Sequence, residues 1–96
     1  MPRRLAPIHS GLILEEDLRD AGVSLNKLAR DIRVPMNRIS AIVNGKRSIT
    51  ADTAMRLALF FGTTPQYWMN LQTNYDLTVA DLEAGSRIRE DVKALA

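Results

Sequence analysis

The sequence has 96 residues, 46% of them hydrophobic and 25% charged, which is the composition of one globular domain and excludes an intrinsically disordered chain. It has no cysteine and one histidine, so disulfides, thiolate zinc sites and a cysteine nucleophile are excluded, and we expect neither a metal nor a cofactor. The formal net charge of +2 does not by itself require a nucleic-acid partner.

Apolar residues recur at helical spacing along nearly the whole chain. Leu14 and Leu18 lie on one face of a first helix predicted over about residues 10–21, which Gly22 ends. A second helix follows the N-cap Ser24, and a third begins near Pro35 and ends at the dipeptide at positions 44–45. The apolar positions of these two short helices are Leu25, Leu28, Ala29, Ile32, Met36, Ile39 and Val43.

The second half of the chain predicts two more helices and a weaker C-terminal segment. A fourth helix lies between the N-cap Thr50 and Gly62, and a fifth begins at Thr64-Pro65. After Leu77 the pattern weakens, and a sixth helix, interrupted at Gly85-Ser86, is expected to be partly exposed, mobile or held by a partner; a frayed terminus is the alternative. Its signals are a Thr78/Asp81 capping box and the apolar residues Leu82, Ile88, Val92 and Leu95. No alternating strand pattern exists, so the predicted class is all-α, with a domain over residues 1–77 and a helix or tail over 78–96.

The basic residues of the chain concentrate around the second and third helices. The segment from Ser24 to Arg47 has six bases and one acid, a local charge of +5, whereas residues 76–96 have five acids and three bases. Two short helices with a tight turn near Arg33-Val34 form the arrangement of a DNA-binding helix-turn-helix, here about residues 24–44. An ordinary αα-corner in a small bundle is the alternative.

The outer face of the third helix suits the major groove of DNA. At about 100° per residue, Ile39, Ile42 and Val43 turn to the core and leave small and amide side chains outside. Asn pairs with adenine, Arg with guanine, and Ala or Met touches a thymine methyl, while this face has no acid. The candidate base contacts are Met36, Asn37, Ser40, Ala41 and Asn44, and the candidate phosphate contacts are Ser24, Lys27, Arg38, Lys46 and Arg47. Any single one of these cations could equally be a solvated surface residue.

Other chemically active residues have plainer interpretations. His9 has no paired nucleophile and is expected to be a cap or surface residue. The run Glu15–Asp17 fans out over about 200° of a helix, so it cannot converge on one ion. Tyr67, Trp68 and Tyr75 could stack on single-stranded nucleic acid, but at helical spacing they favour the core or a dimer interface. Candidate dimer or partner contacts are Trp68, Tyr75, Leu82 and Ile88, and no enzyme is expected.

Two sets of motifs resemble known proteins. Leu28-Ala29, Ile39-Ser40 and Asn44-Gly45-Lys46 resemble the lambda-repressor-like (Xre-type) helix-turn-helix. The run from Asn44 to Ala58, the Tyr-Trp-Met-Asn-Leu-Gln stretch ending at Gln72 and the sequence Tyr75-Asp76-Leu77 closely resemble the HigA (VapI-type) antitoxins. The resemblance covers roughly residues 8–77, and the aromatic stretch is its most specific part. The chain departs from the family at Arg33, where Gly is usual, which predicts a strained or altered turn.

The resemblance implies a compact five-helix fold and a homodimer that represses its own operon through a pseudo-palindromic, double-stranded operator. It also implies a toxin partner, a HigB (RelE-like) mRNA endonuclease. The base and phosphate contacts that it implies agree with those read from the helical wheel. A stand-alone Xre-type repressor without a toxin is the alternative, and a protein-interaction module that has lost DNA binding is a third possibility. The chain has a basic start at Met1–Arg4 but no long apolar run, so we expect a cytoplasmic protein without signal peptide or membrane span.

Overall fold

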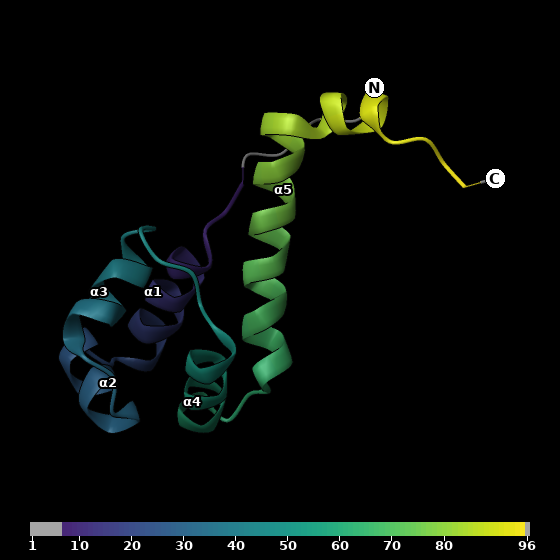
Figure 1. Cartoon of the computed structure of the whole chain (residues 1–96). Helices are drawn as coiled ribbons and strands as arrows, with labels where there is room; N and C mark the ends of the chain where they lie inside the picture. The colour runs from purple at the N-terminus through teal and green to yellow at the C-terminus, as the bar shows by residue number, and fades with distance from the viewer. Residues whose placement is uncertain (1–6, 96) are drawn as a thin grey trace.

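The computed structural model describes residues 7–95, which contain five helices (Figure 1). No strand occurs in this part of the chain, which confirms the all-α prediction. The basic start and the last residue of the predicted tail lie outside the described residues. The helices are α1 (Ser10–Ala21), α2 (Leu25–Ile32), α3 (Met36–Val43), α4 (Ala51–Phe61) and α5 (Pro65–Asp91).

The cap residues expected from the sequence set the helix ends. Ser24, Thr50 and Thr64 each accept a hydrogen bond from the backbone N–H three residues further on, which satisfies a free donor at the start of α2, α4 and α5. Gly22 and Gly62 end α1 and α4 in the left-handed conformation, with φ of 69° and 71°. Local chemistry therefore fixes where four of the helices start or stop.

One hydrophobic core joins all five helices. In pairs, α1 and α2 pack against α3, α2 also packs against α4, and α5 packs against α4 and α1. None of these described helices is long and apolar enough to cross a membrane. The fully buried large side chains include Leu14, Leu28, Ile39, Ile42, Ile49, Leu57 and Trp68.

Gly11 allows α1 to approach α3 at backbone distance. A Cβ atom at this position would overlap the backbone carbonyl of Ile42 and lie 3.0 Å from the Cα of Val43. Glycine is required here because any side chain would push the two helices apart. The C-terminal end of α3 is therefore supported directly by the first turn of α1.

The C-terminal segment differs from its prediction, since α5 continues unbroken from Pro65 to Asp91 and no separate sixth helix follows it up to residue 95. The predicted Thr78/Asp81 capping box is wrong: the Thr78 hydroxyl donates to the backbone carbonyl of Asn74, 2.8 Å away, within the helix. A helix that already has several turns needs no new N-cap, because elongation is easier than nucleation.

Gly85-Ser86 does not interrupt α5 either. Asp81 and Arg89 form an ion pair of 2.9 Å across this point, and a Cβ at Gly85 would overlap the Asp81 carboxylate. The helix bends toward its C-terminal end and carries it away from the other four helices (Figure 1), so the molecule is elongated, 50 × 26 × 22 Å.

Candidate nucleic-acid interface

The turn between α2 and α3 is tight and strained. Arg33 ends α2 with φ 59° and ψ 48°, the left-handed conformation expected of a glycine at this place. The backbone N–H of Val34 donates to Ala29 at 3.0 Å, which closes the turn. The sequence predicts either a strained or an altered turn at Arg33, and the structure has the strained turn. The turn directs the N-terminus of α3 outward.

The two sides of α3 divide as the helical wheel predicts. Ile39 and Ile42 are fully buried, and Val43 packs partly against the core. On the opposite side Asn37 and Asn44 are exposed, whereas the smaller Ser40 and Ala41 are half-buried between them. These, together with the exposed Met36, are all five candidate base-contacting residues. The structure thus brings them together on one open face.

Two basic residues without an ion-pair partner among the described residues follow this helix. Lys46 and Arg47 are exposed and form no ion pair within residues 7–95. Arg38, on the flank of α3, is half-buried, and its Nε is the one buried side-chain polar atom without a hydrogen-bond partner among the described residues. The exposed Lys46 and Arg47 can bind a phosphate without first breaking an ion pair within the described residues.

The remaining phosphate candidates, on α2, are partly engaged. The Lys27 ammonium contacts Asp31 at 2.7 Å, and this hydrogen bond holds the pKa of the Asp31 carboxyl below its usual value. Asp31 is the only acid in the basic segment from Ser24 to Arg47, and its ion pair with Lys27 neutralises this one negative charge. Ser24 caps α2, whose positive dipole end would face a phosphate placed there.

The predicted partner contacts separate into a core residue and surface residues. Trp68 has no exposed surface: it packs beside Phe61 and its indole N–H donates to Thr63 at 2.9 Å, so it offers nothing to a partner. Aromatic side chains at helical spacing fit either core or interface, and burial under α4 decides for the core. Leu82 and Ile88, in contrast, are 39% and 48% exposed on α5.

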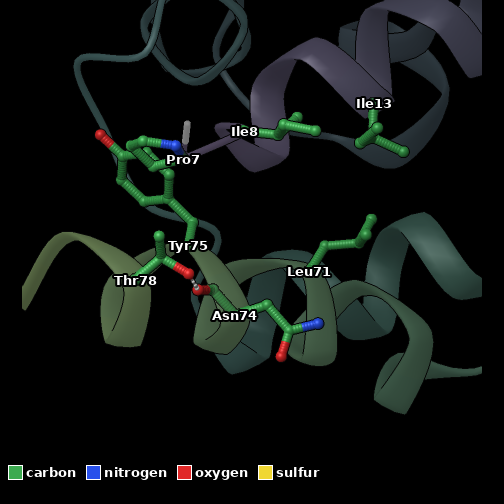
Figure 2. Close-up of a pocket in the computed structure, with 7 residues that line it drawn as sticks. All are labelled: Pro7, Ile8, Ile13, Leu71, Asn74, Tyr75 and Thr78. Carbon is green, nitrogen blue, oxygen red and sulfur yellow. Dashed lines mark hydrogen bonds between the residues drawn. The ribbon is translucent and has the colours of Figure 1, made fainter. Parts of the chain in front are cut away.

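His9 and Tyr75 meet at the other end of α1. His9 Nδ1 accepts from the backbone N–H of Gly11 at 2.9 Å, so the expected cap role is confirmed. The imidazole packs edge-on against the Tyr75 ring, with centroids 4.6 Å apart. A shallow apolar groove of about 260 Å³ opens beside this pair, with Ile8 and Ile13 on one wall and α5 on the other (Figure 2). The other lining residues are Pro7, Leu71, Asn74, Tyr75 and Thr78.

This groove has no catalytic equipment. Its lining contains no nucleophile paired with a base. Within the described residues no three His, Asp or Glu side chains gather where they could hold a metal ion. Sequence reasoning did not identify the groove, because it forms only where α5 passes the segment before α1.

Sequence reasoning also missed Gln72, which is buried and makes four hydrogen bonds. Its signal was present in the sequence, since Gln72 ends the motif that is most specific for the resemblance.

The comparisons with known proteins agree with this geometry. The helix-turn-helix family matches residues 14–68. Virulence-associated protein I of Dichelobacter nodosus is 46% identical over 80 residues, which are 82% of this chain and 74% of that protein. A HigA-family addiction-module antidote protein of Coxiella burnetii is 50% identical in its solved structure, with a TM-score of 0.90 over 94% of this chain and 99% of the other. The Pseudomonas aeruginosa antitoxin HigA, solved with the higBA promoter, is 38% identical, with a TM-score of 0.89 over 95% of this chain and 100% of the other.

Proposed function

This chain belongs to the helix-turn-helix family and, within it, to the HigA antitoxins, and we propose that it binds operator DNA as a homodimer, represses its own operon and neutralises a HigB-like toxin. The Pseudomonas aeruginosa antitoxin HigA was solved with the higBA promoter, which supports DNA binding by the same fold here. The family is one of DNA-binding antitoxins and not of enzymes.

The open face of α3 is the observation that carries this proposal. It presents amide and small side chains, it has no acid, and none of its polar groups is needed by the core. Asn37 and Asn44 read bases in this proposal, while Met36, Ser40 and Ala41 contact base edges and methyl groups. Ser24, Lys27, Arg38, Lys46 and Arg47 hold phosphates and thereby fix the register of α3.

The homodimer in this proposal rests on the resemblance to the HigA antitoxins. Two copies would place their α3 helices in successive major grooves about 34 Å apart, on half-sites roughly 10 base pairs from centre to centre. Residues 1–77 form the DNA-binding part in this proposal. The part of α5 beyond Leu77 supplies partner contacts, which the exposure of Leu82 and Ile88 supports.

Paired substitutions test the DNA-binding proposal. Asn37→Ala and Asn44→Ala should each weaken operator binding by about 1–3 kcal/mol and leave binding to random duplex nearly unchanged. Lys46→Ala and Arg47→Ala should weaken binding to both duplexes and reduce the salt slope by about one unit per contact. Asn70→Ala, an exposed amide on α5, is the matched control and should change neither. Equal losses on both duplexes for the two α3 variants would refute base reading.

Toxin neutralisation has its own test. The small open reading frame next to this gene should arrest growth when expressed alone, and co-expression of this protein should restore growth. A harmless neighbour would favour the alternative, a stand-alone repressor. Absence of salt-dependent binding to any duplex would instead favour a protein-interaction module that has lost DNA binding.

A further inference from the structure

Gln72 is a buried junction between three segments of the chain. The residue is 3% exposed. The carbonyl oxygen accepts from the Ser10 hydroxyl at 2.6 Å and from the backbone N–H of Ile49 at 2.8 Å. The amide nitrogen donates to the Ser48 hydroxyl at 3.2 Å and to Asp76 Oδ1 at 2.9 Å. One amide has two acceptor and two donor positions, and all four are used.

Two of these partners belong to the loop between α3 and α4. The start of this loop is attached to α3, because the backbone N–H of Lys46 donates to the Ala41 carbonyl at 2.8 Å. Among the described residues, the next backbone N–H with a partner is that of Ile49, and its partner is Gln72. The Ile49 side chain is also buried, which fixes the end of the loop in the core.

Lys46 and Arg47 therefore lie on a span held at one end by α3 and at the other by α5. We propose that Gln72 is a positioning residue for this loop: it holds Lys46 and Arg47 where they contact the phosphates beside the base-reading face of α3. The inference rests on the proposed DNA binding. Gln72 itself lies on α5, away from the surface of α3, so its role is to position the loop and not to contact DNA.

The glutamine cannot be replaced by an apolar residue of similar size without consequence. Methionine would leave the Ser10 hydroxyl and the Ile49 N–H buried without partners. Glutamate would still accept from both groups, but it would lose the two donors and place a second carboxylate beside Asp76. The two variants thus separate the acceptor role, which anchors the loop, from the donor role.

The experiment measures the protection of the loop amide in the free protein and the number of phosphate contacts in the complex with DNA. Amide hydrogen exchange by NMR reports on the Ile49 N–H, and a salt series with a duplex from the promoter upstream of this gene gives the number of phosphate contacts. Gln72→Met should expose the Ile49 amide to fast exchange and reduce the salt slope by up to about two units, about 0.9 for each lost contact. Gln66→Met, the same substitution at an exposed position of α5, is the control and should change neither quantity.

Each outcome decides the inference. Slow exchange at Ile49 in Gln72→Met, or fast exchange with an unchanged salt slope, would overturn it. If the wild-type chain shows no salt-dependent binding to DNA, the proposed function fails and the phosphate role of the loop fails with it. The exchange data would still report separately whether Gln72 holds the loop through the Ile49 N–H. Should Gln72→Met not fold, Gln72→Glu replaces it and is expected to keep Ile49 protected; loss of protection there would also overturn the inference.

Discussion

The strained turn at Arg33 leads to a prediction about stability. Arg33 adopts the left-handed conformation, its side chain is exposed, and it forms no ion pair within residues 7–95. The conformation costs an L-residue roughly 1–2 kcal/mol. Glycine avoids this cost but loses more backbone entropy on folding, about 0.5–1 kcal/mol. Arg33→Gly should therefore raise the free energy of unfolding by about 0.5–1 kcal/mol.

Thermal unfolding followed by circular dichroism measures this difference. For a domain of this size, 1 kcal/mol shifts Tm by about 4–8 °C, so Arg33→Gly should raise Tm by about 2–8 °C. Arg30→Gly is the control, because it removes the same charge from an exposed position inside α2, where glycine costs about 1 kcal/mol. An unchanged or lower Tm for Arg33→Gly would refute the reasoning. A rise in both variants would mean that the lost charge, and not the backbone, is responsible.

Three further changes test other features of the fold. Gly11→Ala should destabilise the domain by about 3 kcal/mol, the upper end of overpacking costs, because the new methyl group overlaps the backbone carbonyl of Ile42. Urea unfolding measures this loss of stability. A loss below about 1 kcal/mol would show that α1 can shift to make room for the methyl group. Thr64→Ala should cost about 1 kcal/mol by removing the N-cap of α5, whereas Thr64→Ser should retain most of it. The pKa of the Tyr67 phenol is raised by burial and then by the charge of Asp17, which accepts its hydrogen bond at 3.1 Å. The neutral phenol thus stabilises the fold at neutral pH, and this contribution is lost as the pH rises through the raised pKa. Asp17→Asn should lower the pKa of the Tyr67 phenol. Tyrosinate absorbance measures this pKa in a variant in which the other tyrosine is replaced by phenylalanine. An unchanged pKa would show that Asp17 is not a cause of the shift.

Most of the architecture could be predicted because its signals are local. The N-caps Ser24, Thr50 and Thr64 and the glycines that end α1 and α4 act within one helical turn of themselves. The buried and open sides of α3 follow from a spacing of three and four residues. The division of α3 into a buried and an exposed side can therefore be predicted without any tertiary contact.

The features that sequence reasoning missed depend on distant segments. Gln72 bonds Ser10 and Ile49, which lie 62 and 23 positions away along the chain. The burial of Trp68 depends on the placement of α4 over α5. The sequence predicts an interruption of α5 at Gly85, and this prediction is wrong because the elongation of a helix that is already formed outweighs the local helix-breaking signal of glycine.

The separation of the two sides of α3 has a consequence for how such proteins diversify. Ile39 and Ile42 hold the helix against α1 and α2, whereas the side chains of Asn37 and Asn44 are exposed on the other side of α3. If Asn37 and Asn44 read bases as proposed, changes at these two positions would alter which DNA sequence is preferred while the fold stays intact. Duplicated copies in one genome could acquire separate operators through a few substitutions on this helix. The same property makes Asn37 and Asn44 suitable positions for a library in which operator preference is selected and folding is held constant.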